Sequence, residues 1–295
     1  MMRDVDRLTI IGTGLLGGSI GLGLREAGYQ GRILGVGRNP QTVELAKQRG
    51  CVDDVSTDLG QAVRESQLVI LATPLSSFPA LLDQIARQDH PRLIITDVGS
   101  TKQQVCTDAR HRLPQPARFV GSHPMAGGER HGPKHARANL FYDKPCIITA
   151  DADTDPDAQR TVENLWTQLG MRLIHLPAHE HDRQVALISH LPHLLASLIV
   201  ELAADRGGLE IASTGFGDTT RVASGDPQVW LDIFTSNREA VIQAINAFSD
   251  RLAAFRHGLT QDDHSSILEF LRRSKEARDQ WPKTGFDRRR STGSD

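Results

Sequence analysis

Three glycines near the N-terminus have the spacing of a phosphate-binding turn. The run Gly12–Gly17 follows a strand-like segment and opens a helix-like one, the context in which this spacing is informative. Gly12 would make the tight turn, Gly14 would let the backbone approach a pyrophosphate, and Gly17 would let helix and strand pack closely. The helix N-terminus would offer free N–H groups to the phosphates. A glycine-rich turn that binds nothing is the alternative. The run predicts dinucleotide binding by Gly12, Gly14, Leu15, Leu16 and Gly17.

The residue after the second expected strand bears on which dinucleotide binds. The nucleotide-binding pattern expects a carboxylate about 20 positions after the last glycine, where it binds the ribose 2′-hydroxyl. Gly37 and Arg38 stand there instead. A missing carboxylate removes the repulsion of a 2′-phosphate, and Arg38 could pair with that phosphate through two parallel hydrogen bonds. We therefore expect NADP to be favoured over NAD. If NAD is preferred, Arg38 stacks on the adenine or points to solvent.

Thr73 and Pro74 directly follow the apolar run Leu68–Leu71. They would occupy the carboxyl end of a parallel sheet, where open α/β folds bind ligands. We predict that both contact the cofactor, although a plain turn would use the same residue types.

The first half of the chain alternates short β-branched runs with helix-like stretches, a pattern typical of βαβ units. The expected strands are Leu8–Ile11, Arg32–Val36, Leu68–Leu71, Leu93–Thr96, Phe119–Gly121, Cys146–Thr149 and Arg172–His175. Helices are expected at Leu15–Ala27 and Gln41–Arg49, each closed by a glycine. The pattern predicts an α/β fold, with an N-terminal Rossmann-like parallel sheet domain over residues 1–176. An all-α C-terminal dimerisation domain over residues 177–282 and a disordered tail over 283–295 are expected to follow.

The second half of the chain has an almost purely helical pattern. Gln184–Asp205 carries apolar residues at three-and-four spacing. Asp226 and Pro227 form a good helix start, and one apolar stripe continues from there to Phe255. A helix of that span would be about 45 Å long, more than a small domain needs. We therefore expect it to pack along a second copy in a homodimer, with an ordinary long core helix as the alternative.

Composition argues against several classes of partner. The 295 residues carry 34 Lys+Arg against 36 Asp+Glu, so no bulk attraction to nucleic acid is expected. No run approaches the roughly 18–20 apolar residues of a membrane span, and no signal peptide is expected. The cysteines at 51, 106 and 146 lack metal-ligand spacing and fit a reducing cytoplasm. We expect no metal site and interpret the run His179–Asp182 as solvated surface.

Further segments that could carry chemistry follow the glycines. They are Thr96–Lys102, Gly121–Glu129, Ser189–His193, Gly215–Arg221 and Ser224–Trp230. In this order they resemble the prephenate/arogenate dehydrogenase family of tyrosine biosynthesis, and the resemblance covers roughly residues 6–280. It implies NAD(P)-dependent oxidative decarboxylation of prephenate to 4-hydroxyphenylpyruvate. Such a reaction needs a base of near-neutral pKa for the substrate hydroxyl and a fixed cation for the anionic substrate.

The resemblance implies catalytic roles for His123 and Ser100. His123 matches the family's catalytic histidine in a GxHPxAG segment and would accept the proton of the 4-hydroxyl. Ser100 matches a serine that would orient His123 and bridge the substrate to the nicotinamide. The structural alternatives are a histidine in a turn before proline, and a serine that caps a helix beginning near Thr101.

The resemblance also implies a set of substrate-binding residues. The guanidinium of Arg221 would bind a substrate carboxylate, and Glu129 and Asp218 would join it in an ionic cluster at the site entrance. His193 would lie on the substrate side, and Trp230 would wall the ring pocket. Because Arg221 belongs to the helical half, the site is expected between the two domains. A structural ion pair of Arg221 with Asp218 and a core role for Trp230 are the alternatives.

Arogenate, which has an ammonium in place of the keto group, is an alternative substrate. Arg38 and the segment around His123 look like NADP-using arogenate enzymes, whereas His193 looks more like prephenate enzymes. We favour prephenate. A β-hydroxyacid dehydrogenase is disfavoured, because those enzymes use a lysine in the helical half and residues 180–278 contain only Lys275. A catalytically silent NADP-sensing protein is the alternative from another class.

Overall fold

The computed structural model describes Met2, residues 5–128 and residues 130–281. Glu129 and the tail predicted at 283–295 lie outside the described residues. The strands are β1 (Arg7–Ile11), β2 (Arg32–Val36), β3 (Asp54–Ser56), β4 (Leu68–Leu71), β5 (Ile94–Asp97), β6 (Phe119–Pro124), β7 (Pro145–Thr149) and β8 (Arg172–His175). The α-helices are α1 (Leu15–Glu26), α2 (Pro40–Gln48), α3 (Leu59–Arg64), α4 (Phe78–Ala86), α5 (Gln103–Arg112), α6 (Pro156–Gln168), α7 (Ala178–Val185), α8 (Leu191–Arg206), α9 (Thr214–Thr220), α10 (Pro227–Ser236), α11 (Arg238–Thr260) and α12 (His264–Gln280).

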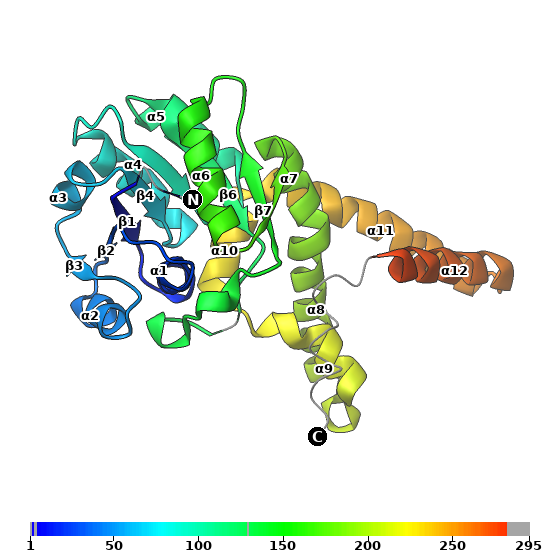
Figure 1. Ribbon diagram of the computed structural model, residues 1–295. Coiled ribbons are helices and arrows are strands. Elements are labelled where there is room, and N and C mark those ends of the chain that lie inside the picture. The colour runs from blue at the N-terminus through cyan, green and yellow to red at the C-terminus, as the bar shows by residue number, and fades with distance from the viewer. Residues whose placement is uncertain (1, 3–4, 129, 282–295) are drawn as a thin grey trace. The chain divides into compact units, whose positions relative to one another are not determined.

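The strands form one sheet in the order β3-β2-β1-β4-β5-β6-β7-β8 (Figure 1). The predicted parallel sheet is confirmed for β1 to β6, whose order is that of a Rossmann sheet. β7 differs, because it runs antiparallel to β6, and β8 is parallel to β7. β3 and α3 are absent from the predicted elements, since three and six residues are too few to display a hydrophobic period.

The strand order reverses between β1 and β4. The chain leaves β1 toward β2 and β3, then returns to place β4 on the other side of β1. Ile11 pairs in register with Leu71, so the carboxyl ends of β1 and β4 lie together. Ligands of doubly wound sheets bind in the crevice at such a reversal. This edge of the sheet is therefore the place to look for the site.

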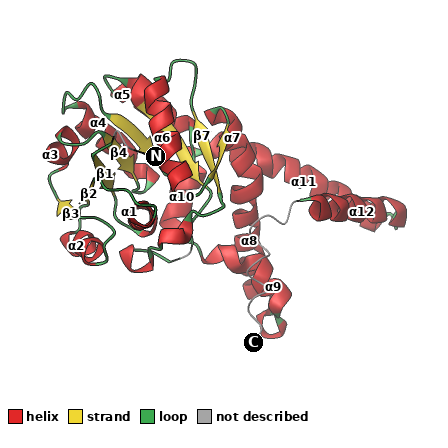
Figure 2. Cartoon of the chain, viewed as in Figure 1, coloured by secondary structure: helices red, strands yellow, loops and turns green. Residues whose placement is uncertain are grey.

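Helices cover both faces of the sheet, as Figure 2 shows around the yellow strands. On one face, Ile20 of α1 and Trp166 of α6 belong to the same buried cluster as Ile10 of β1. On the other, Phe78 of α4 and Val105 of α5 are buried in a second cluster. Strands covered on both faces read as continuous apolar runs, which is why the sequence locates them well. The double cover holds the strand ends that carry the site.

The helix Ala178–Arg206 is continuous over 29 residues and includes a π turn, Ala186–His190, between α7 and α8. Pro192 accounts for this turn, because proline has no N–H for the carbonyl four residues earlier and its ring crowds that carbonyl. Unlike the sequence expectation, the helix is long and apolar enough to cross a membrane by length and composition alone, with 33% of its most apolar window buried. A core helix of a soluble protein passes the same test, so this property is weak evidence for a membrane span.

The prediction of one continuous helix from Asp226 to Phe255 is wrong. The chain forms α10 and α11 with a break at Asn237, where φ is −114° and ψ is 30°. The Asn237 side chain is buried and donates a hydrogen bond to the carbonyl oxygen of Asp182 at 2.8 Å. An apolar stripe that continues through both helices does not reveal this break.

The chain divides into two compact units, Met1–Arg238 and Glu239–Asp295. In the second unit, the rings of Phe255 on α11 and Phe270 on α12 lie 5.4 Å apart. The site residues described below belong to the first unit. The domain boundary at residue 176 stays a prediction.

Candidate active site

His123 lies near the carboxyl end of β6 and is buried, with 9% of the residue exposed. Its Nδ1 lies 2.8 Å from Nε2 of His181, which α7 brings from 58 residues further along the chain. The two rings meet edge to face with centroids 5.0 Å apart. The hydrogen bond on one ring nitrogen fixes the orientation of the ring and the role of the other nitrogen.

His181 is in turn held by Asp182. His181 Nδ1 lies 2.7 Å from Asp182 Oδ1, and the same carboxylate accepts hydrogen bonds from the backbone N–H groups of Lys102 at 2.7 Å and Gln103 at 2.9 Å. Asp182 therefore caps the N-terminus of α5, a position that favours a carboxylate. The prediction that His181 and Asp182 are solvated is wrong, since they are 0% and 2% exposed. Of this run, His179 is exposed as predicted.

Burial lowers the pKa of His123 well below its ordinary value, and nearby His181, Lys102 and His190 lower this pKa further. The imidazole is therefore neutral near pH 7, with a proton on one nitrogen and a lone pair on the other. Nδ1 of His123 contacts His181. Nε2 of His123 is therefore the ring nitrogen that can bind a further group. A neutral, oriented histidine with one available nitrogen can act as a general base.

A buried ion pair lies beside this histidine. Lys102 Nζ contacts the Asp97 carboxylate, and both side chains are 0% exposed. Asp97 also accepts hydrogen bonds from the N–H groups of Gly99 at 2.7 Å and Ser122 at 3.1 Å, and Lys102 Nζ donates to the Ser122 carbonyl at 3.0 Å. The pair thus ties the loop after β5 to β6, one residue before His123. Both members lie in the segment Thr96–Lys102, but the sequence predicts a role for neither of them. The sequence signal that points to this ion pair is a carboxylate at the end of an apolar strand.

Ser100 lies partly buried in the loop between β5 and α5. Its hydroxyl makes no hydrogen bond to a described residue, so the predicted orienting contact with His123 is absent and His181 supplies it instead. The alternative of a helix cap is also wrong, because α5 begins at Gln103 and Asp182 accepts the N–H groups there. Ser100 follows β5, the strand that pairs with β6. Its catalytic role stays a prediction.

His193 and Trp230 form an aromatic wall between α8 and α10. Their rings stack with centroids 3.5 Å apart and an interplanar angle of 11°, and Phe234 lies 5.6 Å from Trp230. Gly225 packs so closely that a Cβ there would lie 2.3 Å from Nε1 of Trp230. Burial lowers the pKa of His193, so its ring is neutral near pH 7. The structure brings these two predicted residues together, and their contact with substrate stays a prediction.

His190 links the wall to the His181–Asp182 pair. Its Nδ1 lies 3.2 Å from Asn237 Nδ2, which also donates to the backbone carbonyl of Asp182. Burial lowers the pKa of His190 to about 4, against the opposing charge of Asp182. A neutral His190 can accept at Nδ1, so Asn237 is the donor.

Within the described residues, no group of three or more His, Cys, Asp or Glu side chains is placed to hold a metal ion.

Arg221 and Asp218 lie at the end of α9. Asp218 belongs to the helix, and Arg221 begins the 3₁₀ turn Arg221–Ser224 that follows it. Both residues are exposed, and each has an interaction within the chain. Glu129, the predicted third member of the ionic cluster, lies outside the described residues. The substrate-binding role of the cluster stays a prediction.

The glycine turn has the geometry that a dinucleotide needs. Gly12 has a φ of +97°, and a Cβ there would lie 2.5 Å from the carbonyl oxygen of Ala72. A Cβ at Gly17 would lie 2.0 Å from the Gly12 carbonyl oxygen, whereas the space beside Gly14 is open. No side chain caps α1, and Oγ1 of Thr13 is buried without a hydrogen-bond partner among the described residues. Open space, uncapped N–H groups and an unpartnered hydroxyl fit a pyrophosphate.

The remaining predicted cofactor residues lie around this turn or just beyond it. Thr73 borders the turn, since a Cβ at Gly12 would lie 2.8 Å from its Cγ2, and its Oγ1 lies 2.7 Å from Ser77 Oγ. Pro74 follows it and is exposed. Arg38 follows β2, is exposed, and makes no ion pair with a described residue. The contacts of these residues with a cofactor stay predictions.

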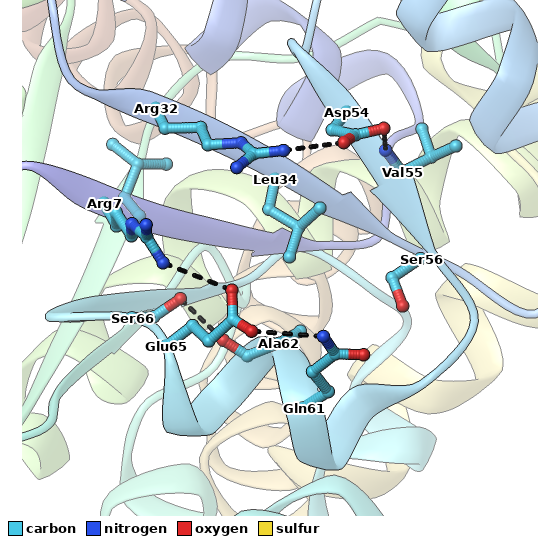
Figure 3. A pocket seen from close by; sticks show the side chains of 11 residues that line it. Arg7, Arg32, Leu34, Asp54, Val55, Ser56, Gln61, Ala62, Glu65 and Ser66 are labelled. Atoms are coloured by element: carbon cyan, nitrogen blue, oxygen red, sulfur yellow. Dashed lines mark hydrogen bonds and ion pairs between the residues drawn. The ribbon is translucent and has the colours of Figure 1, made fainter.

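A cavity of about 160 Å³ lies between β1–β3 and α3 (Figure 3). Arg7 pairs with Glu65 at 3.3 Å and Arg32 pairs with Asp54 at 2.7 Å, so charges that line the cavity are matched. Arg7 and Arg32 begin their strands, which places the cavity at the amino ends of β1 and β2. The cavity is thus at the opposite edge of the sheet from His123 and the glycine turn.

The Rossmann sheet, the fitting glycine turn and the neutral buried histidine define a dinucleotide-dependent dehydrogenase. Sequence comparison gives the family. Residues 20–175 match the family described as "Prephenate dehydrogenase, nucleotide-binding domain", and residues 177–273 match "Prephenate dehydrogenase, dimerization domain". The chain belongs to the prephenate dehydrogenase family.

Individual relatives agree with this assignment. The chain is 32% identical to the prephenate dehydrogenase of Bacillus subtilis, over 96% of this chain and 78% of that protein. Its structure is similar to a crystal structure of prephenate dehydrogenase from A. aeolicus in complex with hydroxyphenyl propionate and NAD+, with a TM-score of 0.88, 29% identity, and coverage of 92% and 97% of the two chains. It is also similar to Synechocystis arogenate dehydrogenase, with a TM-score of 0.80, 27% identity, and coverage of 94% and 100%.

Proposed function

We propose that this chain catalyses the NAD(P)-dependent oxidative decarboxylation of prephenate to 4-hydroxyphenylpyruvate, a step of L-tyrosine biosynthesis. The observation that carries the proposal is the neutral His123, oriented by His181 at the edge of the sheet that also holds the glycine turn. Membership of the prephenate dehydrogenase family and the likeness to the B. subtilis and A. aeolicus enzymes support the substrate.

The residues present suit the chemistry of this reaction. Prephenate is a cyclohexadiene with a ring carboxylate, a 4-hydroxyl and a pyruvyl side chain. Its oxidation removes a hydride from C4 and releases the ring carboxylate as CO2, which leaves an aromatic ring. The hydroxyl proton is lost as C4 becomes a carbonyl, and the phenolate oxygen regains a proton when the ring becomes aromatic. NAD(P), when bound, supplies the hydride acceptor. His123 accepts the hydroxyl proton at Nε2, because its ring is neutral near pH 7 and its Nδ1 is engaged.

The remaining polar and aromatic residues are proposed to bind the substrate. His193 and Trp230 line the ring pocket as a stacked pair. Ser100 bridges the substrate and the nicotinamide from the loop after β5. Asp218, Glu129 and Arg221 are proposed to form an ionic cluster at the site entrance, where Arg221 binds a substrate carboxylate. Gly12, Gly14, Leu15, Leu16, Gly17, Thr73, Pro74 and Arg38 are proposed to bind the dinucleotide.

Replacing Arg221 with Ala is expected to raise KM for prephenate by about 10- to 100-fold, the factor that corresponds to one charge-assisted hydrogen bond, with little change in kcat. Steady-state kinetics measures both constants. Arg160→Ala is the matched control, since this exposed arginine of α6 pairs with Asp157 and is expected to leave both constants unchanged. A fall in kcat at constant KM would contradict the proposed role of Arg221.

Arogenate is the second candidate substrate, and the likeness to Synechocystis arogenate dehydrogenase favours testing it. We expect kcat/KM to be higher for prephenate than for arogenate, and higher with NADP than with NAD. The NADP preference rests on Arg38, which is exposed and unpaired among the described residues, whereas the NAD+ complex of the A. aeolicus relative supports NAD. Arg38→Ala is expected to lower kcat/KM about tenfold for NADP alone. An equal loss for both cofactors would assign Arg38 to another role.

We also propose a cytoplasmic homodimer. The match to a dimerization domain supports the dimer, and exposed apolar side chains on α8, including Leu198 and Leu202, would gain cover in it. Sedimentation of dilute protein tests the dimer. Three free cysteines, Cys51, Cys106 and Cys146, support a reducing compartment. No nucleic-acid or membrane partner is proposed.

A further inference from the structure

Three side-chain groups form a buried line that ends at a helix N-terminus. His123 Nδ1 lies 2.8 Å from His181 Nε2, and His181 Nδ1 lies 2.7 Å from Asp182 Oδ1. The Asp182 carboxylate accepts the N–H groups of Lys102 and Gln103, where α5 begins. All three members of the line are buried. Water therefore does not compete for these hydrogen bonds, and each ring nitrogen in the line needs a defined role.

The roles follow from the end of the line. A backbone N–H can only donate, so the Asp182 carboxylate is an acceptor, and His181 must donate to it from Nδ1. With a single ring proton, on Nδ1, His181 carries a lone pair on Nε2 and accepts there. His123 must therefore donate from Nδ1, and its own lone pair is on Nε2.

We propose that His181 and Asp182 are positioning residues, which hold His123 as the tautomer with its proton on Nδ1 and so leave Nε2 free to act as the base. The proposal rests on the proposed role of His123 in proton transfer. With the opposite tautomer, His123 would present an N–H to the substrate hydroxyl and could not accept its proton. Loss of a group that sets the histidine tautomer is strongly damaging in other enzymes that use a histidine base.

Asp182, at the end of the line, is held in place by hydrogen bonds from two other parts of the fold. Asp182 receives two backbone N–H groups from the first turn of α5, where the partial positive charge of the helix favours a carboxylate. Asn237 holds the Asp182 backbone carbonyl from the end of α10. The line therefore connects the loop after β5, α7 and the end of α10 to the base on β6. These contacts explain why a histidine and an aspartate of so polar a run are buried.

The first measurement is the tautomer of His123 in the full-length protein by ¹⁵N NMR. The resonance of His123 is assigned by its absence in a His123→Asn variant. We expect a neutral ring with the proton on Nδ1 in the wild-type protein. A proton on Nε2 overturns the proposal. This readout does not depend on turnover, so it decides the proposal even if the proposed reaction is wrong, and it needs no altered His181.

The second measurement uses variants of His181. His181→Phe keeps a ring but removes both nitrogens, and we expect the His123 proton to move to Nε2 and kcat to fall by about 10- to 100-fold with KM unchanged. His181→Gln keeps an acceptor within reach of His123, and we expect it to recover most of the lost kcat. His179→Phe, on the exposed side of the same helix, is the matched control and should change neither readout.

The outcomes separate this proposal from the proposed function. Unchanged His123 tautomer in His181→Phe, or equal loss of kcat in the Phe and Gln variants, overturns the positioning role. Full activity in His123→Asn overturns the proton-transfer role of His123, whatever the tautomer. If His181→Phe fails to fold, His181→Gln and the wild-type spectrum still decide the assignment.

Discussion

Replacing His123 with Asn is expected to lower kcat by about 10²- to 10⁴-fold, the usual contribution of a general base. The Asn amide can keep a polar contact with His181, but nothing remains at the position of Nε2 to accept the hydroxyl proton. Dinucleotide affinity is expected to be unchanged, because the glycine turn lies between β1 and α1 and not on β6. The loss should therefore appear in the chemical step.

Steady-state kinetics with prephenate gives kcat, and fluorescence titration with the reduced dinucleotide gives its affinity. His175→Asn is the matched control, because this half-exposed histidine of β8 contacts Glu163 at 2.8 Å and is expected to leave both quantities unchanged. A fully active His123→Asn protein would remove His123 from the mechanism. If the wild-type chain binds NADP yet turns over neither prephenate nor arogenate, the silent NADP-sensing alternative holds.

The sheet is largely predictable because strands buried on both faces need unbroken apolar runs. The expected bounds of Arg32–Val36, Leu68–Leu71 and Arg172–His175 agree with the structure. Asp54–Ser56 is missed because only one of its residues is apolar. The antiparallel direction of β7 is not encoded in its apolar run, which suits either direction.

The helical half is predicted less well, because its turning points depend on single polar contacts. The break at Asn237 follows from the hydrogen bonds of one side chain to Asp182 and His190. An amphipathic pattern averages over a window of residues and passes through such a position unchanged. The pattern therefore gives the helices but not where they separate.

The site residues, like the elements of the fold, are only partly predictable from the sequence. The sequence points to His123 through its motif, whereas its partner His181 lies in a run whose charge suggests solvent. Polar side chains at core positions contradict the hydrophobic pattern, and they do so most often at functional sites. Here a layer of such residues, from the Asp97–Lys102 pair to the His181–Asp182 pair, surrounds the base. Only a fold that brings distant segments together reveals it.

The stability of that layer is expected to depend on Lys102. Lys102→Met removes one partner of a fully buried ion pair and leaves the Asp97 carboxylate unpaired, which typically costs about 3–5 kcal/mol. Urea unfolding at pH 7 measures the loss. Lys275→Met removes the lysine of an exposed pair with Asp279 on α12 and is the matched control, with an expected cost of about 0–1 kcal/mol. A loss below about 1 kcal/mol in Lys102→Met would contradict the argument.

Two further comparisons test whether the charge of Asp97 is responsible. Asp97→Asn in the Lys102→Met background removes the unpaired charge and is expected to recover most of the lost stability. Burial raises the pKa of Asp97 against the opposing charge of Lys102, so without Lys102 the folded-state pKa rises further above that of the unfolded chain. The folded variant then retains a proton that the unfolded chain releases as pH rises, and stability present in acid is lost toward neutral pH. The deficit of Lys102→Met is therefore expected to be largest near pH 7 and to shrink as the pH is lowered.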